Sequence, residues 1–174
     1  IFFCKVDIDT VLTHYDSIRY YKHFLQTGLL SVDAETGQVK AWVGGINYKH
    51  FQFDHVKQGK RQVGSTFKPF VYATAINQLH ISPCDKFPNT PYTIPSGKYG
   101  LIEDWTPKNS SNRYGGMLNL KSALANSVNV ITANLIDQVT PQNVITLANN
   151  LGIESKIPNA PSIALGSLDL SIYE

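Results

Sequence analysis

The chain has 174 residues and a formal net charge of +2, enough for one folded core. Its charged fraction of 16% is below the usual quarter, which predicts a large buried or partner-covered surface. The small net charge, with no run of Lys or Arg, argues against nucleic-acid binding. No stretch approaches the ~20 apolar residues of a membrane span.

The histidines and cysteines lack the spacing of metal ligands, so we predict no metal and no cofactor. Cys4 and Cys84 lie eighty positions apart. We expect both thiols to be buried, with a disulfide between them as the alternative.

A short helix is predicted from a cap at Asp16 and Ser17 to Gln26, with Gly28 ending it. Its inward-facing residues would be Ile18, Tyr21 and Leu25. Two strands follow, at residues 29–33 and 38–43, joined by a polar turn at 34–37 whose glycine suits a positive φ.

The most informative stretch, residues 61–76, opens a long apolar helix expected to end near His80. Its inward stripe is Val71, Tyr72, Ala75, Ile76 and Leu79, and extending the stripe backwards reaches Lys68 and Ser65. Pro69 lacks an N–H group, so an irregular helix opening is expected.

Ser65 and Lys68 stand at i and i+3, which on a helix places them on one face about 5–6 Å apart at Cβ. Burial would lower the pKa of Lys68 and make it a base for Ser65, while the helix N-terminus would stabilise negative charge. The alternative is an ordinary helix start, with Ser65 or Thr66 as N-cap and Lys68 in solvent.

The segment from Pro83 to Gly116 is punctuated by prolines and longer than an ordinary connection. Its interleaved apolar residues predict a packed loop that walls a groove; they are Tyr92, Ile94, Tyr99, Leu101 and Trp105.

Three helices are expected after this loop. Asn119 should cap the first, which runs to about Asn126. The second carries a stripe at Ile131, Leu135 and Val139, and the third, opened by Thr140 and Pro141, one at Val144, Leu147, Ala148 and Leu151 before Gly152. A hairpin followed by helices predicts an α+β fold.

Ser127 and Asn129 stand between two of these helices. Alone, such a pair is an ordinary helix cap. Combined with Ser65 and Lys68, it supplies a second hydroxyl that relays a proton and an amide that holds the lysine and a substrate carbonyl.

With these two motifs the chain resembles the penicillin-binding proteins, serine D,D-transpeptidases of peptidoglycan synthesis with Ser-x-x-Lys, Ser-x-Asn and Lys-Thr-Gly motifs. Residues 61–72 resemble the class A, bifunctional type. Further similar stretches are residues 28–45, 105–109, 123–129 and 161–166.

The resemblance implies an antiparallel sheet flanked by helices, with Ser65 at the start of a central helix. It implies catalysis by Ser65, Lys68, Ser127 and Asn129, and the predicted substrate-binding residues are Trp105, Asn109 and Gly116. The implied partners are peptidoglycan stem peptides ending in D-Ala-D-Ala and β-lactams, on the extracytoplasmic side of a bacterial membrane.

One feature departs from the family pattern: no Lys-Thr-Gly or Lys-Ser-Gly follows Ser127. We therefore expect residues 1–27 to be a linker strand and short helix, and residues 28–174 to be the N-terminal part of a transpeptidase domain. The glycosyltransferase domain, the membrane anchor and the rest of the transpeptidase domain would lie elsewhere in a parent protein, and this chain alone would be inactive or weak.

Two other functions remain open. A serine β-lactamase would need a deacylating water with an acidic partner, for which Glu103 and Asp104 in the long loop are unconvincing candidates. The second is a non-catalytic penicillin-sensing module that has kept the motifs.

Overall fold

The structure is a computed structural model that describes residues 9–49 and 51–174. It divides into two compact units, Ile1–Val56 and Lys57–Glu174, which are described separately. The predicted α+β class is confirmed, since helices accompany three antiparallel strand pairs. Over the described residues, no helix is both long and apolar enough to cross a membrane.

The helix of the first unit, α1 (His14–Lys22), differs from the prediction. Thr13 caps it by accepting a hydrogen bond from the Asp16 N–H at 3.1 Å, and the helix ends four residues before Gln26. None of its residues is buried, and the side chain of Ile18 is 58% exposed. An apolar stripe becomes a buried face only where a second apolar surface packs against it, so the expected inward orientation of Ile18, Tyr21 and Leu25 was wrong.

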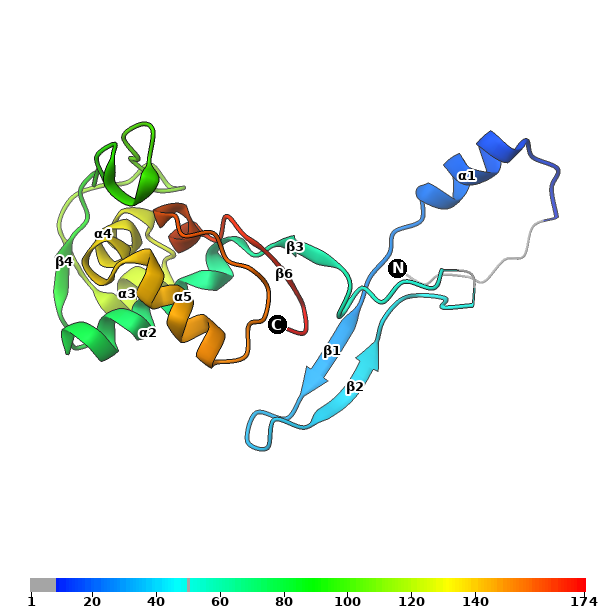
Figure 1. Cartoon of the computed structure of the whole chain (residues 1–174), viewed down its shortest axis with the longest axis horizontal. Helices are drawn as coiled ribbons and strands as arrows, with labels where there is room; N and C mark the ends of the chain where they lie inside the picture. The colour runs from blue at the N-terminus through cyan, green and yellow to red at the C-terminus, as the bar shows by residue number, and fades with distance from the viewer. Residues whose placement is uncertain (1–8, 50) are drawn as a thin grey trace. The chain divides into compact units, whose positions relative to one another are not determined.

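The predicted hairpin is confirmed (Figure 1). Strand β1 (Leu29–Val32) pairs antiparallel with β2 (Val39–Val43). The Asp33 carboxylate accepts hydrogen bonds from the backbone N–H groups of Glu35 and Thr36, at 3.0 and 2.9 Å. Gly37 follows with a φ of +69°, so the turn uses glycine where a left-handed residue is required.

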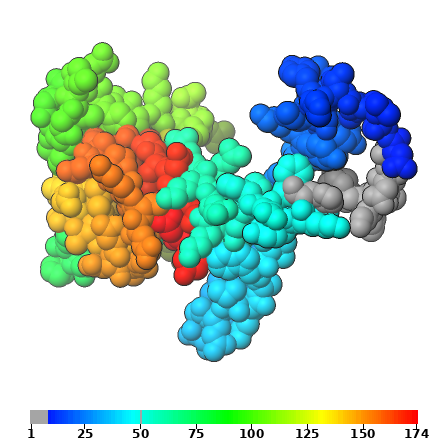
Figure 2. Space-filling view, turned by 45° about the vertical axis from the view of Figure 1, so that its right-hand side comes forward, coloured from blue at the N-terminus to red at the C-terminus, as the bar shows by residue number. Residues whose placement is uncertain are grey.

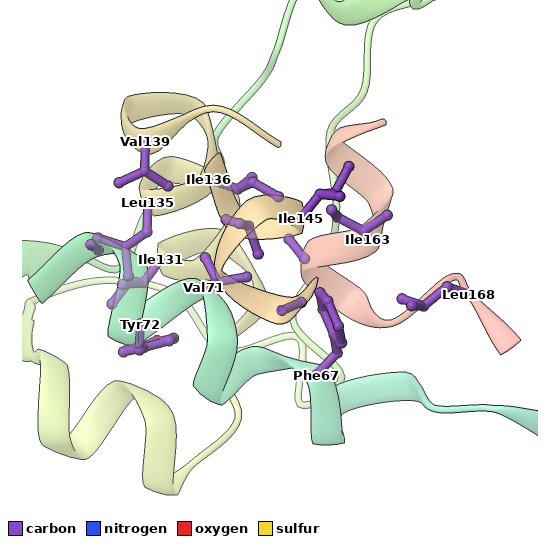
Figure 3. Close-up of a cluster of buried hydrophobic side chains, with 14 of the residues drawn as sticks. Phe67, Val71, Tyr72, Ile131, Leu135, Ile136, Val139, Ile145, Ile163 and Leu168 are labelled. Carbon is purple, nitrogen blue, oxygen red and sulfur yellow. The ribbon is translucent and has the colours of Figure 1, made fainter. Parts of the chain in front are cut away.

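The core of the second unit lies among helices. Helix α2 (Lys68–Leu79) packs against α4 (Asn129–Val139) and α5 (Pro141–Asn150), and the 3₁₀ helix η3 (Pro161–Leu165) packs against α4. Figure 3 shows their apolar side chains meeting between the ribbons; those labelled are Phe67, Val71, Tyr72, Ile131, Leu135, Ile136, Val139, Ile145, Ile163 and Leu168.

The predicted stripes are confirmed in most positions. In α4, all three stripe residues are at most 1% exposed, and in α2 the stripe is buried through Ala75, whereas Ile76 is 38% exposed. In α5, Val144 and Ala148 are buried, but Leu151 is 65% exposed because it lies just past the helix end, where the chain turns away.

Short strands and caps connect these helices. Strand β3 (Lys60–Gln62) pairs with β6 (Asp169–Ser171), and β4 (Lys86–Pro88) pairs with β5 (Met117–Asn119). In Figure 2 the red C-terminal segment lies directly against the turquoise segment around β3. As predicted, Asn119 caps α3 (Leu120–Ala125), and its side chain accepts from the Ser122 N–H at 2.8 Å.

The long loop between β4 and β5 is packed, as predicted. Ile94 is fully buried and pairs through its backbone with Trp105, while the 3₁₀ turn η2 (Lys98–Gly100) lies between them. Tyr92 and Lys98 both contact the Asp137 carboxylate of α4, at 2.7 and 2.5 Å. These polar contacts hold the loop against the helix.

Cys84, in the turn that precedes β4, is exposed, so its predicted burial was wrong. The turn around it is built from polar contacts between Ser82 and Asp85. Cys4 lies outside the described residues.

Replacing Leu135 by Ala should lower the free energy of unfolding by about 2–5 kcal/mol, because the side chain is fully buried and its loss leaves a cavity. Chemical denaturation measures this effect. Leu151→Ala is the matched control and should change the value by about 0.5 kcal/mol or less, since Leu151 is mostly exposed. Equal effects of the two substitutions would contradict this description of the core.

Candidate active site

The segment that carries Ser65 begins as a 3₁₀ helix, η1 (Gly64–Phe67), which continues into α2 at Lys68. The Lys68 N–H donates to the Ser65 carbonyl, and Pro69, which lacks an N–H, stands in the first turn of α2. The predicted irregular opening is therefore confirmed.

The two predicted catalytic residues in this segment, Ser65 and Lys68, differ in their exposure to solvent. Lys68 is 1% exposed, whereas Ser65 is exposed. The expectation that both lie on the buried face thus holds for Lys68 and was wrong for Ser65. Ser65 lies in η1, and Lys68 follows it by three residues at the first position of α2.

The Lys68 ammonium group donates three hydrogen bonds to Ser127 and to Asn129, the first residue of α4. Its Nζ lies 2.7 Å from the Ser127 carbonyl oxygen, 2.9 Å from Ser127 Oγ and 2.6 Å from Asn129 Oδ1. A lysine ammonium has three donors, so the group is fully satisfied. The structure therefore brings together residues about sixty positions apart in the sequence.

Ser127 adopts a strained backbone conformation that helps this contact. Its φ is +53°, in the left-handed region that a non-glycine residue seldom occupies. Its N–H donates to the Leu124 carbonyl at 2.9 Å, which closes α3, and both its carbonyl and its hydroxyl reach the same amine. Such conformations cost of order 1–3 kcal/mol and are concentrated at functional sites.

The environment of Lys68 destabilises its charged form. Desolvation by burial lowers the pKa of this amine from 10.5 to about 8. At pH 7 most of the amine still carries its proton, and a minor fraction is neutral. Lys68 can therefore accept a proton from a nearby hydroxyl near neutral pH.

Asn129 is held from three directions. Its Oδ1 accepts from Lys68, its Nδ2 donates to the Lys108 carbonyl at 2.7 Å, and its backbone N–H donates to Asn109 Oδ1 at 3.0 Å. Asn109 is 4% exposed, and its Nδ2 donates to Asn89 Oδ1 and the Arg113 carbonyl, both at 2.9 Å. The structure thus places Asn109 behind Asn129; its predicted contact with substrate stays a prediction.

The other two predicted substrate-binding residues lie in the long loop. Trp105 is half-buried and exchanges backbone hydrogen bonds with Ile94, at 3.0 and 2.9 Å. Gly116 is exposed, and its carbonyl accepts from the Asn89 N–H at 3.1 Å. Across the described ranges, neither residue is hydrogen-bonded to Lys68, Ser127 or Asn129, so their roles in substrate binding also stay predictions.

Sequence reasoning missed the part played by Gly166. The Gly64 N–H donates to the Gly166 carbonyl at 3.1 Å, and a Cβ atom on Gly166 would lie 1.7 Å from the Gly64 oxygen. Gly166 also has a φ of +75°. Residues 161–166 resemble the penicillin-binding proteins, but no local sequence pattern predicts that Gly166 packs against Gly64, the residue before Ser65.

A buried lysine of lowered pKa, an exposed serine three residues before it, and a second hydroxyl and an amide hydrogen-bonded to the lysine form a site typical of serine acyl transfer. Comparison with known families agrees with this class. Residues 27–163 match the model for the penicillin binding protein transpeptidase domain, and the chain belongs to that family.

Curated relatives include penicillin-binding protein 1A of Aquifex aeolicus, which is 36% identical over 149 residues, 84% of this chain and 20% of that protein. Penicillin-binding protein 1A of Neisseria gonorrhoeae is 36% identical over 145 residues, 82% of this chain and 18% of that protein. The chain therefore spans about a fifth of the length of these relatives.

Solved structures share the fold. Penicillin-binding protein 1A from Haemophilus influenzae has a TM-score of 0.75 and 27% identity, over 84% of this chain and 21% of that one. PonA1 from Mycobacterium tuberculosis, in complex with penicillin V, has a TM-score of 0.68 over 91% of this chain and 44% of that one. At 24% identity, PonA1 supports the fold alone.

The Lys68 amine should titrate near pH 8, because burial lowers its pKa from 10.5. NMR of the lysine Cε resonances measures this, and Lys68→Met identifies the signal. Between about pH 8 and 10.5 the unfolded chain binds more protons than the folded one, so the free energy of unfolding should rise with pH. The Lys68→Met variant should lack this part of the rise, and a midpoint near 10.5 would contradict the assignment.

Gly166→Ala should destabilise the second unit and displace the backbone before Ser65, because the added Cβ overlaps the Gly64 carbonyl. We expect a loss of more than about 2 kcal/mol in the free energy of unfolding, measured by chemical denaturation. Gly97→Ala is the matched control: its φ is +84°, but a Cβ there meets nothing within 4 Å. If both variants lose the same stability, backbone strain alone explains the effect and the close approach is unimportant.

Proposed function

We propose that this chain forms the Ser-x-x-Lys and Ser-x-Asn side of the active site of a peptidoglycan D,D-transpeptidase. The observation that carries the proposal is the buried Lys68 amine, which is hydrogen-bonded to Ser127 and Asn129 and stands three residues after the exposed Ser65. Membership of the transpeptidase family supports it. No Lys-Thr-Gly follows Ser127 in this sequence, and we propose that another part of the full-length protein supplies that element.

The first half-reaction forms an acyl-enzyme. The neutral Lys68 amine accepts the proton of the Ser65 hydroxyl, and Ser65 Oγ attacks the carbonyl carbon between two D-alanines of a stem peptide. The Ser65 backbone N–H stabilises the oxyanion that forms. The C–N bond then breaks, and Ser127 passes a proton from Lys68 to the departing D-alanine amine.

The distance between Lys68 and Ser127 suits the second step of this proton path. Ser127 Oγ lies 2.9 Å from Lys68 Nζ, within the range for direct proton transfer. Asn129 Oδ1 fixes the direction of the amine, and its amide orients the substrate. In the second half-reaction, an amine of a neighbouring stem peptide attacks the acyl group and the ester C–O bond breaks. The proton lost by that amine returns to Ser65 Oγ, which completes the crosslink and releases Ser65.

The proposed ligands follow from this chemistry. A β-lactam carries an amide that imitates D-Ala-D-Ala and acylates the same serine, and the structurally similar PonA1 is in complex with penicillin V. Stem peptides lie outside the cytoplasmic membrane, so the proposed location is extracytoplasmic. A glycosyltransferase domain and a membrane anchor elsewhere in the full-length protein complete the proposed class A arrangement.

In the full-length protein, Ser65→Ala should abolish covalent labelling by a fluorescent penicillin, with a loss of at least about 1,000-fold in rate, because the nucleophile is gone. Gel fluorescence measures the labelling. Thr66→Ala is the matched control, since it removes the neighbouring hydroxyl, which donates to the Val63 carbonyl at 2.7 Å. It should label within about threefold of the unmodified protein. Persistent labelling of the Ser65 variant would remove Ser65 from the nucleophile role.

Two further assays separate the transpeptidase from its alternatives. Rapid turnover of nitrocefin by the full-length protein would favour a β-lactamase, because a transpeptidase forms a slowly hydrolysed acyl-enzyme. Labelling without crosslinking of lipid-linked precursor would favour a penicillin-sensing module. Crosslinked product that depends on Ser65 supports the proposal.

A further inference from the structure

Asn109, in the long loop, caps helix α4 from twenty residues upstream. Its Oδ1 accepts hydrogen bonds from the N–H groups of Asn129 at 3.0 Å and Val130 at 3.2 Å. The first N–H groups of a helix have no partner within the helix, and a cap residue normally supplies one. The residue at the cap position of α4 is Val128, whose side chain cannot accept a hydrogen bond. Asn109 fills this role from another segment.

The other end of the Asn109 amide is tied into the loop. Its Nδ2 donates to Asn89 Oδ1 and to the Arg113 carbonyl, both at 2.9 Å. Asn89 is itself buried and forms backbone hydrogen bonds with Gly115 and Gly116. All polar atoms of the Asn109 side chain are therefore used within the protein, and none is left to bind a substrate.

The cap acts on the residue that holds the lysine. The Asn129 N–H donates to Asn109 Oδ1, and its Nδ2 donates to the carbonyl of the adjacent Lys108. The Asn129 Oδ1 is then directed at Lys68 Nζ, 2.6 Å away. Two bonds from the loop thus restrain both the backbone and the amide plane of Asn129. Without them, the first turn of α4 loses its cap and the amide is free to rotate.

We infer that Asn109 is a positioning residue, which orients Asn129 and through it the Lys68 amine. This inference deepens and rests on the proposed function. It also replaces a substrate-binding role for Asn109 by an indirect one. The two roles differ in kinetics, since a positioning residue affects the acylation step and a substrate ligand affects the preceding binding step.

The test compares acylation of the full-length protein and its variants by a fluorescent penicillin at several concentrations, which separates the binding constant from the acylation rate constant. Asn109→Ala should lower the acylation rate constant about 10- to 100-fold with binding nearly unchanged, because a misplaced catalytic group has effects of this size. Asn109→Asp keeps an acceptor for both N–H groups but loses both hydrogen bonds donated by Nδ2, so it should recover only part of the rate. Thermal unfolding shows whether each variant folds.

Asn119→Ala is the matched control. Asn119 also caps a helix, α3, as its local N-cap residue, by accepting from the Ser122 N–H at 2.8 Å. Its loss should lower thermal stability, by less than the loss of the four hydrogen bonds of the Asn109 side chain, and change the acylation rate constant less than twofold. An equal loss of rate in the two variants would show a general effect of stability and overturn the inference, and so would weaker binding at an unchanged rate constant in Asn109→Ala.

Hydrogen exchange provides a readout that does not depend on any reaction with penicillin. The amides of Asn129 and Val130 should exchange faster in Asn109→Ala than in the unmodified protein, and should be unchanged in Asn119→Ala. If the unmodified protein is not acylated, the proposed function fails, while exchange still decides whether Asn109 holds Asn129. Unchanged exchange in Asn109→Ala overturns the inference.

Discussion

Lys68 holds its amine where solvent hardly reaches, and three neutral oxygens satisfy its donors. The choice of partners matters, because a carboxylate at this distance would keep the lysine charged, whereas neutral acceptors allow desolvation to lower its pKa. The amine is therefore both ordered and able to take up a proton. This arrangement depends on bringing Ser127 and Asn129 to the start of α2.

Apolar packing and backbone geometry together bring Ser127 and Asn129 close to the start of α2. Helices α2 and α4 share the core, so the residues at their starts are carried by two elements that cannot shift independently. Ser127 turns the chain through a left-handed conformation, and Gly166 allows a second backbone to support Gly64 closely. The long loop adds polar contacts through Lys108 and Asn109. An irregular segment of this length is thus part of the site's framework.

The family assignment and the geometry of the site support the same interpretation from two kinds of observation. The match over residues 27–163 places the chain among the penicillin-binding transpeptidases, while the contacts of Lys68 give a physical reason for its motifs. Both motifs were readable because their members are adjacent in sequence and their spacing carries the chemistry. The α4 stripe and the hairpin were readable for the same reason, since periodicity and turn residues are local properties.

By itself, the sequence determined the α+β class, the hairpin, the positions of the helices in the second unit and the two motifs. The sequence also indicated that Lys68 is buried, but tertiary structure alone decided that Ser65, three residues earlier, is exposed. It also decided that α1 has no buried face and that Asn109 lies behind Asn129. Burial and long-range hydrogen bonds depend on which distant segments meet, and neither residue type nor spacing encodes that locally.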